Sequence, residues 1–210
     1  EAMNQKAATT MIYGNKLAES ESFTGLAPRY GELSADNAEN IIDAGGTGSD
    51  NTSIFLVGWD AMKTSLIFPK NTTAGLQMDD HGKQITQDDN GNDFTAWISE
   101  FNWRLGLQVR DWRYNARICN IDVSDLNTVA NTKELITWMI MASERIEAIE
   151  GAKFSWYVNR TIREKLRIGI QEKIGNNLSW ETVSGRRVMM FDDIEVGRVD
   201  AILNTEARVV

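Results

Sequence analysis

The kind of secondary structure that the sequence predicts changes along the chain, and this change constrains the fold more than any single motif. The middle third carries strand signals: apolar runs at 53–59 and 66–69, and alternating segments at 83–87 and 94–99 around Asn90-Gly91, a dipeptide typical of tight hairpin turns. The last third predicts helices interspersed with strands. Because no sustained βαβ alternation is present, the sequence predicts an α+β fold.

Helix and turn signals define the first fifty residues. Residues 1–13 predict a helix that Gly14 ends, and a loop-like region with several glycines follows. Ser34 is a candidate N-cap for a short helix that reaches Ala44, where a glycine-rich segment begins. No residue precedes the first helix to cap it, so we expect the chain to start inside an element.

The last third has more regular patterns. Asn131 and Glu134 are spaced as in a capping box, and apolar residues at helical spacing follow as far as Gly151. The other predicted elements are a strand at 154–159, an amphipathic helix at 159–175 and a hairpin at 187–203 that turns at Asp192-Asp193.

Composition excludes several classes of protein. The 210 residues suffice for one large domain or two small ones, and Cys119 is the only cysteine, which excludes an internal disulfide and favours an intracellular origin. No run approaches the roughly 18 apolar residues of a membrane span. The formal net charge of −8 argues against a chain that binds nucleic acid over its whole surface.

A basic and aromatic segment at 101–117, FNWRLGLQVRDWRYNAR, is the most suggestive stretch for function. Cations among aromatic rings are typical of proteins that bind single-stranded nucleic acid. Arginine and aromatic residues are also enriched at protein–protein contacts. The segment therefore has two interpretations, a nucleic-acid platform or a packed strand at a subunit contact.

Side-chain alternation favours the packed strand. Odd positions from 97 to 109 are mostly apolar and even positions mostly polar, which predicts one packed and one solvated face. The parity changes at Arg110-Asp111, where a β-bulge would keep the next aromatic residues on the packed face. A nucleic-acid-binding module using residues 101–117 stays the alternative. We predict that the structural and self-assembly residues of this strip are Trp103, Arg104, Arg110, Asp111, Trp112 and Arg113.

No residue set predicts catalysis, a metal site or a cofactor. His81 is the only histidine and cannot seed a metal site built on several histidines. The segment GGTGSDNTS (45–53) lacks the Lys-Ser/Thr of a P-loop, and the glycine of DDNGND (88–93) is misplaced for a calcium loop. A sugar-binding or carbohydrate-active domain built on tryptophans and carboxylates is a third, unspecific hypothesis. The sequence therefore predicts a protein that is not an enzyme.

Six segments in a fixed order resemble the major capsid protein of a group of short-tailed bacteriophages and related prophages. The resemblance covers essentially the whole chain, and its specificity comes from the order of the segments rather than from any one of them. The segments are GLAPRY (25–30), NIIDAGGTGSDNTSIFLVGW (40–59), FPKNTTAGLQ (68–77), VRDWRYNARICNIDVSDL (109–126), NRTIR (159–163) and VDAILNTEARVV (199–210).

The resemblance implies a capsid fold of the Hong Kong 97 type. The N-terminal arm, the extended loop and most of the spine helix of that fold are expected to precede Glu1. The implied organisation is the end of the spine helix at 1–13, a loop-rich connection with a short helix at 14–51, a strand-rich peripheral-type domain at 52–125 and an axial-type domain at 126–210.

The function implied is that of a structural subunit, which self-assembles into an icosahedral shell and encloses the DNA genome. The expected partners are other copies of the chain in pentamers and hexamers, with scaffolding and portal proteins. The DNA would be enclosed without specific recognition, and neither a membrane nor a cofactor is implied. The expected location is the virion, and the bacterial host cytoplasm during assembly.

Overall fold

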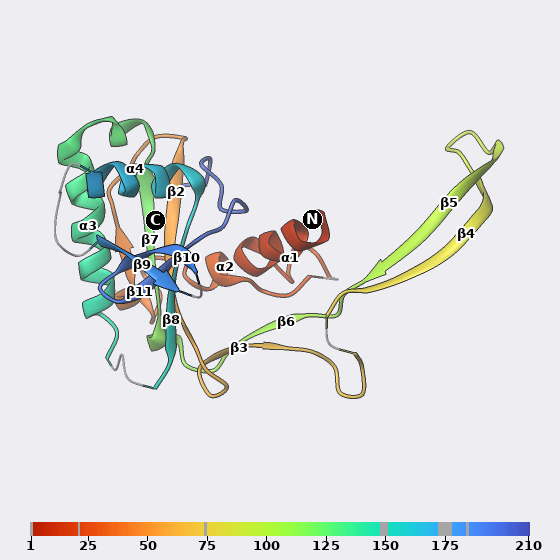
Figure 1. Cartoon of the computed structure of the whole chain (residues 1–210), viewed down its shortest axis with the longest axis horizontal. Helices are drawn as coiled ribbons and strands as arrows, with labels where there is room; N and C mark the ends of the chain where they lie inside the picture. Colours follow the sequence, from red (N-terminus) through yellow and green to blue (C-terminus); the bar gives the residue numbers. More distant parts are fainter. Residues whose placement is uncertain (1, 21, 74, 148–150, 172–177, 184) are drawn as a thin grey trace. The chain divides into compact units, whose positions relative to one another are not determined.

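The computed structural model describes residues 2–20, 22–73, 75–147, 151–171, 178–183 and 185–210. The chain divides into two compact units (Figure 1). Residues 1–65 and 107–210 form the larger unit, which we call the body, and residues 66–106 form the smaller one, the hairpin unit.

One mixed β-sheet organises the body. Its strands lie in the order β1-β7-β2-β8-β11-β10-β9, in which β1–β7 and β8–β11 are parallel pairs and the other neighbours are antiparallel. The strands are β1 (Ile41–Asp43), β2 (Asn51–Trp59), β7 (Asn115–Asp122), β8 (Lys153–Val158), β9 (Leu178–Val183), β10 (Arg186–Phe191) and β11 (Ile194–Arg198). Two short strands accompany them, β3 (Thr64–Ile67) and β6 (Gly106–Val109).

Helices cover both faces of this sheet. On one face pack α3 (Val129–Glu144) and α4 (Arg160–Gln171), and on the other α1 (Ala2–Tyr13) and the single turn α2 (Leu26–Arg29). Residues 51–58 of β2 are all buried, as expected for a central strand with both faces covered. None of the helices described is long and apolar enough to cross a membrane.

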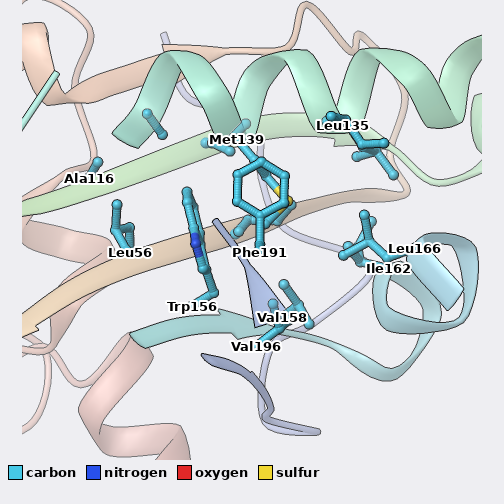
Figure 2. Close-up of a cluster of buried hydrophobic side chains, with 14 of the residues drawn as sticks. Leu56, Ala116, Leu135, Met139, Trp156, Val158, Ile162, Leu166, Phe191 and Val196 are labelled. Carbon is cyan, nitrogen blue, oxygen red and sulfur yellow. The ribbon is translucent and has the colours of Figure 1, made fainter. Parts of the chain in front are cut away.

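The two packed faces follow from alternation along the central strands. In β2, Ile54 and Leu56 join the core beneath α3 and α4, whereas Phe55 and Val57 join the opposite core. The first core is centred on the Trp156 and Phe191 rings, which meet edge to face with centroids 5.7 Å apart (Figure 2).

The hairpin unit is built on β4 (Gln77–Gln87) and β5 (Asp93–Asn102), which form a separate two-stranded antiparallel sheet. The turn between them has the expected sequence, since Gly91 has a φ of +82°. Oδ1 of Asp88 accepts hydrogen bonds from the backbone N–H groups of Asn90 (2.9 Å) and Asn92 (2.8 Å). The hairpin expected around Asn90-Gly91 is therefore confirmed.

Most predicted elements are present with shifted ends. The predicted helix at 34–44 is wrong, because a 3₁₀ turn at Ala38–Asn40 leads into β1, which pairs with β7. Nδ2 of Asn40 donates to the carbonyl groups of Arg113 and Asn115, which holds this segment against β7. The helix α3 begins after Thr128 rather than at Asn131 and ends at Glu144. The first long helix was expected to continue to Gly151, which is wrong, because residues 145–147 are not helical. The predicted end of the second, at 172–175, lies outside the described residues.

The boundary expected at 125/126 does not separate the two units. Strands β2 and β7 share one sheet with β8, so residues on both sides of that position belong to the body. The assignment of 52–125 and 126–210 to peripheral-type and axial-type domains stays a prediction.

Two isoleucines on α4 test the packing of the body. Ile162 is fully buried, whereas Ile168 is 43% exposed. We expect Ile162→Ala to lower the free energy of unfolding by about 2–5 kcal/mol and Ile168→Ala by less than about 0.5 kcal/mol. Urea denaturation of both variants measures the difference, and equal losses would contradict the packing described.

The thiol of Cys119 tests the second core. The side chain is fully buried, and this burial raises its pKa to about 11. We expect no reaction with a thiol reagent at pH 8 in the native protein and rapid reaction in denaturant, because the thiolate is the reactive form. Reaction of the native protein at the rate of free cysteine would show that this core is open.

Candidate assembly surfaces

A buried ion pair stands at the centre of the body. Nη2 of Arg117 on β7 lies 2.8 Å from Oε2 of Glu206 near the C-terminus, and the two side chains are only 4% and 5% exposed. Charges removed from water in this way require hydrogen bonds to their remaining donors and acceptors. The surrounding chain supplies these bonds from segments that are distant in the sequence.

Arg117 donates to three further groups. Its Nη1 bonds to the carbonyl oxygens of Ala27 (3.1 Å) and Tyr30 (2.9 Å), and its Nε to Oγ of Ser53 (3.1 Å). The guanidinium also lies 5.4 Å from the centroid of the Phe55 ring. The α2 turn is thereby fastened to the centre of the sheet.

The Glu206 carboxylate accepts hydrogen bonds from two hydroxyl groups as well as from Arg117. Its Oε1 accepts from the hydroxyl of Tyr13 and its Oε2 from Oγ of Ser53. The Tyr13 hydroxyl in turn accepts from the backbone N–H of Leu203 (2.8 Å). Burial, together with the Glu206 carboxylate, raises the pKa of Tyr13, so its phenol stays protonated and donates. The end of α1 is thus tied to the C-terminal segment.

A second network lies around Asn159. Its Oδ1 accepts from the backbone N–H of Ile162 (2.7 Å), which caps α4, and its Nδ2 donates to Oγ1 of Thr52 (2.8 Å) and to Oδ1 of Asn204. Oγ1 of Thr52 donates to the carbonyl of Leu203 (2.7 Å). Five of the six segments that carry the family resemblance therefore meet in these two networks.

The predicted strip at 101–117 is not one strand. Strand β5 ends at Asn102, β6 covers Gly106–Val109, and a 3₁₀ turn at Trp112–Tyr114 stands where a bulge was expected before β7. Trp103 and Arg104 belong to the hairpin unit, whereas Arg110, Asp111, Trp112 and Arg113 belong to the body. The continuous strand was therefore a wrong prediction, and its six residues do not share one element.

The body residues of the strip are engaged locally. Arg113 donates to both carboxylate oxygens of Asp111 (3.0 and 2.9 Å), and these hydrogen bonds lower the pKa of Asp111; it also donates to Glu147 (3.1 Å). Trp112 is half-buried and packs on the second core, and its carbonyl accepts from the hydroxyl of Tyr30. Arg110 donates from its backbone N–H to the carbonyl of Lys63 (2.8 Å). In the body, therefore, Arg113 is ion-paired and Trp112 is packed on the second core, whereas the side chain of Arg110 is exposed.

The hairpin unit carries an apolar face that was expected to be packed and is instead exposed. In the register of β4 and β5, Met78 lies opposite Phe101, and Ile85 lies opposite Thr95, diagonal to Trp97. Paired residues project on the same side, so these apolar residues share one face. Ile85 is 75% and Trp97 76% exposed. Apolar clusters of this kind mark interaction sites on soluble proteins.

Period-two alternation could not reveal this exposure. Odd positions of β5 were expected to pack, but the same period arises whether an apolar face meets a core or meets solvent. Phe101 and Trp97 are exposed, whereas Leu107, beyond the end of β5, is buried. The hairpin signal was the available clue, since a two-stranded sheet has no second layer of its own.

The residues described offer no metal site. Nε2 of His81 lies 3.2 Å from Oε2 of Glu100 at the base of the hairpin. No group of three or more His, Cys, Asp or Glu side chains among the described ranges is arranged to hold a metal ion.

The buried ion pair makes a testable contribution to stability. We expect Arg117→Met to lower the free energy of unfolding by about 3–5 kcal/mol, because Glu206 is left charged and buried without its cation. The double variant Arg117→Met/Glu206→Gln should lose less than the sum of the two single losses. Urea denaturation of the four proteins measures this coupling, and strictly additive losses would contradict it.

Comparisons with known proteins agree with this architecture. The family model described as "Major capsid protein GP7" matches residues 1–210, and none of the curated proteins matches the chain. A chain in the near-atomic-resolution cryo-EM structure of bacteriophage Epsilon15 is similar, with 34% sequence identity and a TM-score of 0.65. The match covers 99% of this chain and 64% of that chain, so this chain spans less than two thirds of its length. The expected α+β capsid fold is confirmed, and the chain belongs to the major capsid protein GP7 family.

Proposed function

We propose that the chain is a structural subunit of an icosahedral phage shell, which self-assembles and encloses the DNA genome. The observation that carries this proposal, beside the family, is the exposed apolar face of the hairpin unit. A two-stranded hairpin is marginally stable alone. The exposed side chains of Ile85 and Trp97 on this face would be removed from water when other copies of the chain pack on it.

The mechanism is geometric. The polar networks of the body fasten α1, α2, the sheet and the C-terminal segment to one another, which gives each copy the same surface. Identical subunits then close rings when their contacts are heterologous and the rotation between copies returns to its start. An icosahedral shell requires pentamers at its vertices, and larger shells add hexamers.

The DNA is enclosed without specific recognition. The net charge of −8 disfavours a tight grip on phosphates, and the exposed Arg113 is already paired with Asp111 and Glu147. The role is structural and non-enzymatic, in line with the capsid family. Scaffolding and portal proteins complete the proposed set of partners, and the proposed locations are the host cytoplasm during assembly and then the virion.

Assembly of the full-length gene product tests the proposal. Light scattering and negative-stain electron microscopy should show closed shells or rings, alone or with a scaffolding protein. A protein that stays monomeric at every concentration, with or without scaffold, would contradict self-assembly. Binding of nucleic acid by the monomer through residues 101–117 would then support the alternative.

The hairpin face predicts a specific assembly defect. We expect Ile85→Ser/Trp97→Ser to raise the protein concentration needed for assembly by about tenfold or more, since buried aromatic anchors contribute about 2 kcal/mol at interfaces. The unfolding of the body should not change. Leu17→Ser is the matched control, because Leu17 is 98% exposed on the body. Assembly of the double variant at the wild-type concentration would rule out a role for this face.

A further inference from the structure

A basic hollow of about 560 Å³ lies on the body beside α4. Arg160, Arg163 and Arg167 line it from one face of the helix, since their spacing of three and four residues repeats the helical turn. The side chains of Ile168 and Trp180 complete an apolar part of the wall. The hollow therefore combines cations with an apolar surface.

The charges of this hollow are only partly balanced. Among the described residues of its lining, Glu164 is the one carboxylate, and Arg198, which also lines it, is paired with Asp200 at 2.5 Å. Within the described part of the chain, Arg160, Arg163 and Arg167 form no ion pair, and the buried Nε of Arg163 has no hydrogen-bond acceptor. An anionic group would meet surplus positive charge there.

The tip of the β4–β5 hairpin is acidic, whereas the hollow is basic. Asp88, Asp89 and Asp93 surround the turn, and Lys83 is the nearest basic residue along either strand. The Asn92 backbone and side-chain amides hold the pKa of Asp88 below its usual range, so this carboxylate remains charged at neutral pH. The exposed Ile85 and Trp97 lie next to the carboxylates along the hairpin.

We propose that the hairpin tip of one copy docks in the basic hollow of a second copy. This inference rests on the proposed function, because it names the contact through which subunits join. Carboxylates of Asp89 and Asp93 would pair with Arg160 and Arg167, and Ile85 and Trp97 would cover the apolar wall. Each copy gives one tip and receives one, so the contact is heterologous and can propagate around a ring.

A nucleic-acid phosphate is the other anion that such a hollow could bind. That use favours aromatic rings free to stack on bases. The guanidinium groups of Arg167 and Arg187 already lie 5.6 and 5.7 Å from the Trp180 ring. The same chain also carries an acidic hairpin tip beside apolar side chains that are exposed to solvent. These two observations favour a second copy as the occupant.

Paired charge reversals test the contact. The hollow variant is Arg160→Glu/Arg167→Glu, and the tip variant is Asp89→Lys/Asp93→Lys; all four side chains are exposed. In either variant alone, like charges meet at every contact, and we expect the shell yield of the full-length protein to fall at least tenfold. In an equimolar mixture the two variants alternate with opposite charges at every contact of an even-membered oligomer, so mixed oligomers should form again. A chain that carries all four reversals restores opposite charges in rings of any size, and its shell yield should recover.

The controls carry the same charge changes elsewhere on the body. Lys16→Glu/Arg208→Glu matches the hollow variant, and Glu32→Lys/Asp36→Lys matches the tip variant, with all four residues exposed. Both controls should assemble as the wild type does. Circular dichroism and thermal unfolding confirm that every variant is folded, and sedimentation velocity measures the assembled fraction.

The outcomes separate this contact from the shell function. If both variants assemble normally, the docking contact is wrong while the shell subunit stands. If both fail and the mixture forms no mixed oligomers, the contact between copies is overturned, since a contact within one chain cannot be rescued by mixing. Loss of DNA retention in the hollow variant, with assembly unchanged, would assign the hollow to nucleic acid. A wild-type protein that never assembles would overturn both proposals.

Discussion

The buried pair of Arg117 and Glu206 is the interaction on which the rest of the body depends. The two residues lie 89 positions apart, and each charge is tolerable inside the protein only because every neighbouring segment contributes a hydrogen bond. The carbonyl groups of Ala27 and Tyr30, the Ser53 hydroxyl and the Tyr13 phenol complete the set. One network therefore fixes the ends of the chain to the centre of its sheet.

Four of the scattered segments that carry the family resemblance meet in this network. Sequences around Ala27, Ser53, Arg117 and Glu206 carry no common chemistry when they are compared one at a time. In the fold they share one buried site, and a change in one leaves a polar group of another unpaired.

Local patterns predicted the local elements well. The hairpin at Asn90-Gly91, strand β2 and helix α4 follow from turn chemistry and periodicity, which depend on neighbouring residues. The strand β1 was missed because its pairing with β7 outweighs local helix signals. The exposed face of the hairpin was misjudged because alternation does not tell what covers a face. Long-range contacts between residues such as Arg117 and Glu206 leave no periodic signal at all.

The two units differ in what they expose: the body pairs its buried Arg117 and Glu206 internally, whereas the hairpin unit exposes apolar side chains that another molecule can cover. A cryo-EM reconstruction of particles formed by the full-length gene product tests this account most directly. We expect closed shells in which the face bearing Ile85 and Trp97 is buried against a neighbouring subunit. Shells in which this face stays open to solvent would contradict the account.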